Sequence, residues 1–131
     1  MLAKIKIADY MRKNIKTLKK ETDVFIAIQQ LLDHKQTSAP VVDESGKFVG
    51  IFSEKDCIES VLEASYNQGT SGKVADFMTD ETNSVDTETN ILDIAKKFTT
   101  CSERVLPVMT DDQIVGLVSG ENLLKALISI R

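Results

Sequence analysis

The pattern of apolar and polar positions runs through one order of elements twice. Apolar residues first recur at the 3.6-residue spacing of a helix, at Val24, Ile28, Leu31, Leu32 and again at Ile91, Ile94, Ala95, Phe98. Two short apolar runs with a polar turn between them follow, and they predict hairpins at 39–52 and 106–118. A second apolar stripe at helical spacing then closes each half, at Cys57, Ile58, Val61, Leu62 and at Leu123, Leu124, Leu127, Ile128. Each half therefore reads helix, strand, turn, strand, helix.

A constant offset shows that the two halves are copies of one sequence. Residues 6–40 match residues 73–107 at an offset of 67, and one residue dropped in the second hairpin changes the offset to 66. A repeat of this length indicates one supersecondary unit made twice. The expected boundaries and helix-capping residues are repeats at 1–68 and 73–131, a connection at 67–72, and caps at Thr22 or Asp23 and at Thr89 or Asn90.

The fold class follows from the size of the repeat. One small hairpin with two helices cannot cover both faces of its own sheet, so two such units are expected to pack together. We therefore expect an α/β (α+β) fold in which each repeat has a small sheet with flanking helices. The two repeats are expected to be related by pseudo-two-fold symmetry.

Composition and charge exclude several classes of function. The 131 residues are 42% apolar and 27% charged, with a net charge of −4 and few aromatic residues, which does not suggest a nucleic-acid binder. No apolar run approaches the roughly 20 residues that span a bilayer, and the N-terminus lacks the apolar centre of a signal peptide. We expect a cytoplasmic protein without a membrane segment. Basic residues crowd the first copy and acidic residues the second, as on a polarised surface or on two solvated faces.

Catalytic and metal-binding patterns are absent from the sequence. It contains no Walker-type phosphate loop, no GxGxxG and no GxSxG. His34 is the sole imidazole, so a nucleophile would lack a base, and with Cys57 and Cys101 it does not make a four-ligand zinc set. We expect two reduced cysteines, no metal and no enzymatic activity.

The most informative chemistry lies where the second strand of each repeat meets its last helix. These two corners read Gly50-Ile51-Phe52-Ser53-Glu54-Lys55-Asp56 and Gly116-Leu117-Val118-Ser119-Gly120-Glu121-Asn122. A glycine lets a backbone or a ligand come close, and free N–H groups with a serine hydroxyl suit an anion. Asp56, one helical turn further on, could accept hydrogen bonds from a ribose diol. The alternative is that Ser53 and Ser119 are plain helix caps.

The paired corners, the Pro-Val strands at Pro40 and Pro107, and the lead-ins Asp9-Tyr10-Met11 and Asp76-Phe77-Met78 resemble the CBS (cystathionine-beta-synthase) domain. Two copies form a CBS pair, or Bateman module, over nearly the whole chain. The resemblance implies a regulatory module that binds an adenosyl ligand (AMP, ADP, ATP or S-adenosylmethionine) in clefts between the copies. It also implies a homodimer, since such pairs commonly form disc-like dimers through their helices.

The resemblance also assigns roles to individual residues. Carried over by position, the phosphate and ribose contacts are Ser53 and Asp56 in one cleft and Ser119 and Asn122 in the other. The adenine would be held by Asn14, Ile15 and Thr17, and by the equivalent Asn83, Ser84 and Val85. The residues expected to face the phosphates are Thr37 and Arg104. Asn122 departs from the family pattern, because a neutral amide replaces the carboxylate and weakens the expected ribose contact.

Two functions remain in competition at the level of the sequence. The leading hypothesis is a stand-alone sensor of an adenosyl ligand that signals to an unknown effector protein. The alternative is a structural or dimerisation module whose clefts hold no ligand. Large apolar residues at the first corner, Ile51 and Phe52, would favour the second hypothesis if they filled the cleft.

Overall fold

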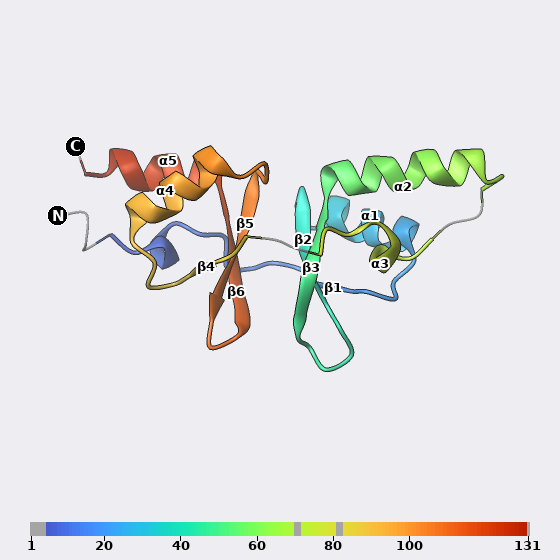
Figure 1. Cartoon of the computed structure of the whole chain (residues 1–131), viewed down its shortest axis with the longest axis horizontal. Helices are drawn as coiled ribbons and strands as arrows, with labels where there is room; N and C mark the ends of the chain where they lie inside the picture. The colour runs from blue at the N-terminus through green and yellow to red at the C-terminus, as the bar shows by residue number, and fades with distance from the viewer. Residues whose placement is uncertain (1–4, 70–71, 81–82, 131) are drawn as a thin grey trace. The chain divides into compact units, whose positions relative to one another are not determined.

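The computed structural model describes residues 5–69, 72–80 and 83–130, which form two compact units (Figure 1). We call Ile15–Glu81 the continuous unit, and Met1–Asn14 together with Thr82–Arg131 the split unit. Both are mixed α and β, with one three-stranded sheet and flanking helices each. The expected fold class is confirmed. The predicted connection at 67–72 includes residues 70 and 71, which lie outside the described residues.

The continuous unit is built on the sheet β1-β2-β3. Its elements are β1 (Leu18–Lys19), α1 (Val24–Asp33), β2 (Ser38–Val42), β3 (Phe48–Ser53), α2 (Glu54–Tyr66) and α3 (Val74–Phe77). β1 is parallel to β2, and β2 and β3 form the predicted antiparallel hairpin. The helices lie against one face of this sheet (Figure 1). The core that they enclose is made by Leu18, Val24, Ala27, Leu31, Ala39, Val41, Phe52 and Val74.

The split unit repeats this arrangement on the sheet β4-β5-β6. Its elements are the 3-10 helix η2 (Ile7–Asp9), β4 (Val85–Asp86), α4 (Ile91–Thr100), β5 (Val105–Thr110), β6 (Gln113–Ser119) and α5 (Gly120–Ile128). β4 is parallel to β5, and β5 and β6 are antiparallel. The core contains Ile7, Val85, Ile91, Ile94, Leu106, Val108, Val118, Leu123 and Ala126.

The lead-in segment of each copy packs on the body of the other copy. In the split unit, the backbone of Arg12 exchanges two hydrogen bonds with Leu117 of β6, at 2.8 and 3.0 Å. In the continuous unit, Thr79 and Ile51 of β3 make the equivalent pair at 2.9 and 3.0 Å. These bonds cover the free edges of β6 and β3, which would otherwise expose unpaired backbone groups. The sequence repeat and the compact unit are therefore different divisions of the chain.

Matched ion pairs follow the same exchange. Lys6 of the first lead-in contacts Glu88 at 2.9 Å, and Lys73 of the second contacts Glu21 at 2.8 Å. Both pairs are exposed, and each carboxylate raises the pKa of its lysine. Exposed pairs contribute little stability by themselves. Because the two pairs occupy equivalent positions of the repeat, each lead-in contacts the other copy in the same way.

Helix starts follow the capping residues that the sequence offers. The Asp23 carboxylate accepts from the backbone N–H of Phe25 and of Ile26 at the start of α1. The Asn90 side chain accepts from the N–H of Leu92 at the start of α4. Asp23 and Asn90, rather than the neighbouring threonines, are therefore the capping residues. The short strands β1 and β4 and the short helices η2 and α3 are features that the apolar pattern did not predict.

Candidate functional site

Both predicted corners form reciprocal hydrogen-bonded caps. At the start of α2, the Asp56 N–H donates to Ser53 Oγ at 3.3 Å, and the Ser53 N–H donates to Asp56 Oδ2 at 2.9 Å. At the start of α5, the Asn122 N–H donates to Ser119 Oγ at 3.2 Å, and the Ser119 N–H donates to Asn122 Oδ1 at 2.9 Å. The capping role is therefore real at both corners. It also fixes the serine hydroxyl and the side chain one turn later in one geometry.

Capping does not use up the hydrogen-bonding capacity of these side chains. A carboxylate has about four lone-pair sites, and the cap occupies one of them, on Oδ2 of Asp56. The amide group of Asn122 keeps its N–H donors, because only its Oδ1 takes part in the cap. The corners also differ in exposure, since Asp56 is 6% exposed and Asn122 is half-buried. One corner thus offers a buried anionic acceptor and the other a more open, neutral amide.

In the continuous unit, the strand register brings the predicted residues to one end of the sheet. Ser53, at the end of β3, is paired with Ser38 at the start of β2, directly after Thr37. Ile15 and Thr17 precede β1, which runs parallel to β2, so they approach the same end. Thr37 and Thr17 are exposed, and Ile15 is half-buried.

In the split unit, a second group of predicted residues gathers in the same way. Ser119 is paired with Val105, directly after the exposed Arg104. Asn83 and Ser84 lead into the edge strand β4, and the Asn83 amide donates to Glu103 at 3.4 Å. The ammonium group of Lys97 donates to the carbonyl of Ser84 at 2.7 Å.

Two predicted residues have other surroundings than expected. The side chain of Val85 is 3% exposed and belongs to the core of the split unit, so only its backbone is near the sheet end. Asn14 belongs to the split unit, whereas Ile15 and Thr17 belong to the continuous unit. The structure therefore does not place Asn14 in the same unit as Ile15 and Thr17.

Gln36 is an organising residue that the sequence reading missed. It is 7% exposed, and its carboxamide accepts from the Lys16 N–H at 2.6 Å. It also donates to the carbonyl groups of Lys16 and Ser38, at 3.1 Å each. Gln36 thus continues the β1–β2 pairing through a side chain and holds the segment around Ile15 and Thr17. The signal in the sequence is a polar residue just before the strand, repeated as Glu103 in the second copy.

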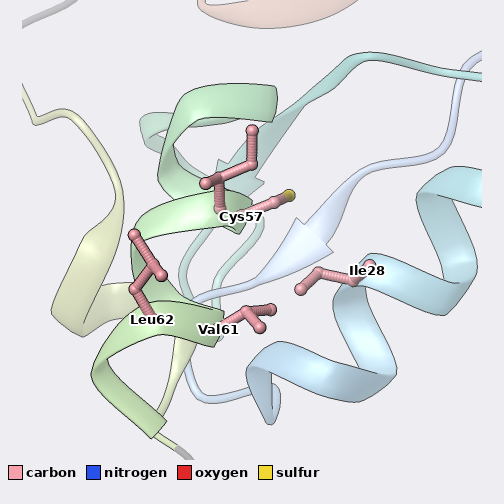
Figure 2. Close-up of a pocket in the computed structure, with 5 residues that line it drawn as sticks. Ile28, Cys57, Val61 and Leu62 are labelled. Atoms are coloured by element: carbon pink, nitrogen blue, oxygen red, sulfur yellow. The ribbon is translucent and has the colours of Figure 1, made fainter. Parts of the chain in front are cut away.

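An apolar groove lies elsewhere on the continuous unit, between α1 and α2 (Figure 2). It has a volume of about 270 Å³ and is lined by Ile28, Cys57, Ile58, Val61 and Leu62. The α2 side of this groove is the apolar stripe predicted for the helix, yet Ile58, Val61 and Leu62 are 58%, 40% and 51% exposed. The buried positions of α2 are Asp56, Ser60 and Ala64. Small residues, not the large stripe, therefore face inward.

The two cysteines are free thiols, and both are half-buried. Burial, aided by the charges of Asp56 and Glu54, raises the pKa of the Cys57 thiol to about 11. Burial also raises the pKa of Cys101. Because the thiolate is the reactive form, neither environment activates a nucleophile.

Within residues 5–69, 72–80 and 83–130, no three His, Cys, Asp or Glu side chains come together as a set that could hold a metal ion. No helix in these same ranges has both the length and the apolar character required to cross a bilayer.

Comparison with known proteins gives one consistent family. A sequence model of the CBS domain matches residues 7–63 and again 74–129. The CBS domain-containing protein CBSX2, chloroplastic, of Arabidopsis thaliana is 28% identical in an alignment 153 residues long. The alignment covers 95% of this chain and 64% of that protein. An uncharacterized protein of Methanocaldococcus jannaschii is 23% identical over 121 residues, covering 92% of this chain and 42% of that protein. The chain thus spans less than two thirds of the length of either relative.

Solved structures agree with the sequence comparison. The crystal structure of CBSX2 in complex with AMP has a TM-score of 0.80 and 28% identity, and the match covers 95% of this chain and 97% of that chain. A CBS domain pair in complex with 5′-methylthioadenosine and S-adenosyl-L-methionine has a TM-score of 0.80 and 22% identity, covering 96% of this chain and 98% of that chain. The second match, at its lower identity, supports the fold alone.

Proposed function

Because the chain belongs to the CBS domain family and carries two tandem copies, we propose that it is a regulatory module that binds an adenosyl ligand and signals its occupancy to a partner protein. The observation that carries the proposal is the pair of capped corners, each at the end of a sheet where the other predicted contacts gather. The related CBSX2, solved in complex with AMP, makes AMP the first ligand to test. ADP, ATP and S-adenosylmethionine belong to the same chemical class.

In the continuous unit, Asp56 is the proposed ribose contact. Its carboxylate is already oriented by the Ser53 N–H, and it retains lone pairs for a diol. Ser53 and Thr37 are the proposed phosphate contacts, and the segment of Ile15 and Thr17 would hold the base. Gln36 fixes that segment through Lys16, so base recognition would not require the loop to reorganise.

In the split unit, the proposed contacts have a different charge balance. Asn122 offers a neutral amide to the ribose, whereas Arg104 offers a guanidinium fork, which matches phosphate oxygens. Ser119 is the proposed second phosphate contact, and Asn83, Ser84 and the backbone of Val85 would hold the base, with Asn14 as the contact from the first lead-in. A weaker ribose contact and a stronger phosphate contact would thus occur together at this corner.

Calorimetric titration of the purified chain with AMP, ADP, ATP and S-adenosylmethionine tests the proposal. We expect a saturable heat with at least one of them, and Asp56→Ala should weaken binding by about 1.5–3 kcal/mol because a charged acceptor is lost. Glu59→Ala, on the exposed side of the same helix, is the matched control and should bind as the parent does. No heat and no thermal shift with any of the four ligands at millimolar concentration would refute the proposal.

We also propose that the module is a cytoplasmic, non-catalytic homodimer. Equivalent large apolar side chains are exposed on the helices of both units: Phe25, Ile58 and Leu62 in one, and Leu92, Leu124 and Ile128 in the other. A second copy could cover each of these faces with the equivalent helices of its own chain. Light scattering should give twice the monomer mass, and Leu62→Lys with Ile128→Lys should give the monomer. Lys substitutions at the exposed polar positions Glu59 and Glu121 serve as controls.

The second candidate function is a structural module that dimerises without a ligand. The apolar groove of α1 and α2 and the satisfied caps at both corners favour it. It predicts a stable dimer whose melting temperature does not respond to adenosyl compounds. A ligand-dependent shift that Asp56→Ala removes would exclude this alternative.

A further inference from the structure

In the split unit, the segment proposed to hold the base, residues 83–85, is held from α4 by an ammonium group. Lys97, half-buried in the last turn of α4, donates from Nζ to the carbonyl of Ser84 at 2.7 Å. A distance this short is typical of a hydrogen bond with a charged donor. Because the peptide group is planar, fixing the Ser84 carbonyl also fixes the direction of the Val85 N–H. Lys97 therefore sets the backbone orientation at this end of the sheet.

The two copies hold this segment with different chemistry. In the continuous unit, the Gln36 carboxamide both accepts from the Lys16 N–H and donates to the Lys16 carbonyl. The equivalent residue of the split unit is Glu103, which accepts from the Asn83 amide at 3.4 Å. An ionised carboxylate accepts hydrogen bonds but cannot donate one to a carbonyl. The donor that Gln36 supplies in one copy must therefore come from another residue in the other copy.

Comparison of the copies identifies Lys97 as that donor. The offset of 67 pairs Lys97 with Gln30, just as it pairs Glu103 with Gln36. Two neutral amides of the first copy are thus a cation and an anion in the second, and the summed charge of the two positions is the same. The donor has moved from the residue before the strand to the preceding helix, where it contacts the next carbonyl along the segment. The two differences between the copies therefore compensate each other.

We propose that Lys97 is a positioning residue for base recognition in the split unit, and that Lys97 and Glu103 together give the support that Gln36 gives in the continuous unit. This inference rests on the proposed adenosyl ligand and extends it, because it names what keeps residues 83–85 in place for the base. Lys97 has no ligand contact of its own and acts through the backbone of Ser84. Binding of the base at this site should therefore depend on a donor at position 97.

Calorimetry with AMP, and with ribose 5-phosphate as a competitor that lacks the base, provides the test. The Asp56→Ala chain is the starting point, because it loses the proposed ribose contact of the continuous unit and leaves the split unit to be measured. In this background, Lys97→Met should weaken AMP binding about three- to tenfold, the equivalent of one hydrogen bond, and change ribose 5-phosphate binding less than about twofold. Lys97→Arg keeps a charged donor and should retain most of the AMP affinity.

A second substitution tests the compensation directly. Glu103→Gln gives the split unit the carboxamide that Gln36 provides in the continuous unit, with both an acceptor and a donor. Combined with Lys97→Met, it should restore AMP affinity to within about threefold of the Asp56→Ala chain, because the lost donor is replaced. Lys96→Met, at the exposed neighbouring position of α4, is the matched control. It removes the same charge from the same helix and should leave AMP affinity within about twofold.

The outcomes separate this inference from the function on which it rests. Unchanged AMP affinity in Lys97→Met, equal losses for AMP and ribose 5-phosphate, or a loss that neither Lys97→Arg nor Glu103→Gln relieves would overturn the role of Lys97 alone. Absence of AMP binding by the Asp56→Ala chain would also overturn it, while AMP binding by the parent would still support the proposed function.

Absence of binding by the parent for all four adenosyl ligands would overturn both proposals. Should Lys97→Met fail to fold, Lys97→Gln allows the same comparison, because it withdraws the ammonium group and introduces the residue type that the first copy has at Gln30.

Discussion

Replacing Gly116 by alanine tests whether the first lead-in is docked on β6 as the structure describes. A Cβ atom at this position would lie 2.7 Å from Met11 Sδ and 2.8 Å from the carbonyl oxygen of Arg12. The methionine side chain can rotate away. The Arg12 carbonyl cannot move freely, because it accepts the hydrogen bond from the Leu117 N–H at 3.0 Å. Relief of the clash therefore requires the lead-in to shift or to lose that hydrogen bond.

The size of the effect follows from these contacts. Overpacking of this kind costs about 1–3 kcal/mol, and a lost hydrogen bond adds about 1 kcal/mol. The smaller entropy of an unfolded chain with alanine offsets roughly 0.4–1 kcal/mol of this. A net loss of about 2 kcal/mol corresponds to a fall of about 7 °C in the melting temperature of a chain of this length.

Thermal denaturation followed by circular dichroism is the assay, with Gly120→Ala as the control in the same corner. A Cβ at Gly120 meets nothing within 4 Å, and the residue begins α5. Alanine there should stabilise the protein by about 0.5–1 kcal/mol, since glycine is a poor helix former. The same substitution should thus have opposite effects on stability at two glycines that are four residues apart. A Gly116→Ala variant that melts within about 2 °C of the parent would refute the docking of Met11 and Arg12.

Three further predictions concern the continuous unit. Asp23→Ala should lower the free energy of unfolding by about 1 kcal/mol in urea, through loss of the cap of α1, and Asp33→Ala at the other end of α1 is the control. Gln36→Leu should cost more, about 2–4 kcal/mol, because it leaves the backbone of Lys16 unpaired in a largely buried place; an unchanged urea midpoint would contradict this. The folded pKa of the Cys57 thiol, raised from 9.0 to about 11, means that the unfolded chain releases its proton first, so stability should fall as pH rises from 9.0 towards 11. Cys57→Ala should flatten this pH dependence.

The local elements of the fold were predictable because their signals are local. The two hairpins follow from apolar runs around a polar turn, and Asp23 and Asn90 cap the helices that they precede. β1 and β4 were not predicted, because a strand of two residues is too short to show a period. The apolar stripe of α2 was predicted correctly as a feature of the helix, but its spacing did not show that its large side chains are exposed. Whether Leu62 faces a core or a groove depends on the neighbours of the helix, not on its own spacing.

The exchange of lead-ins could not be read from a repeat. Lys6 and Lys73 are the same residue type, as are Glu21 and Glu88, so pairing within a copy and pairing between copies satisfy the same charges. A duplicated sequence leaves this choice open, and only the spatial arrangement of the chain decides it.

The candidate site divides in the same way between local and non-local information. Ser53 and Asp56 were found because a capping box has a fixed spacing of three residues. Gln36 was missed because its importance lies in burial and in its contacts with Lys16 and Ser38, which depend on how the chain folds rather than on local spacing.

The exchange also determines how the stability of one unit depends on the other. The continuous unit contains its own sheet, helices and covering lead-in within one stretch of 67 residues, Ile15–Glu81. The split unit needs both Met1–Asn14 and Thr82–Arg131, so it closes a loop around that stretch. While the continuous unit is folded, the ends of this loop are held by a compact body. When it unfolds, the split unit must close a flexible loop at an entropic cost of about 4 kcal/mol, a large part of the stability of a small domain. A ligand that stabilises the continuous unit would therefore also stabilise the split unit. The stability of the continuous unit depends less on the split unit, because its own chain is unbroken. Ligand binding at the proposed Asp56 corner would thus raise the stability of both units.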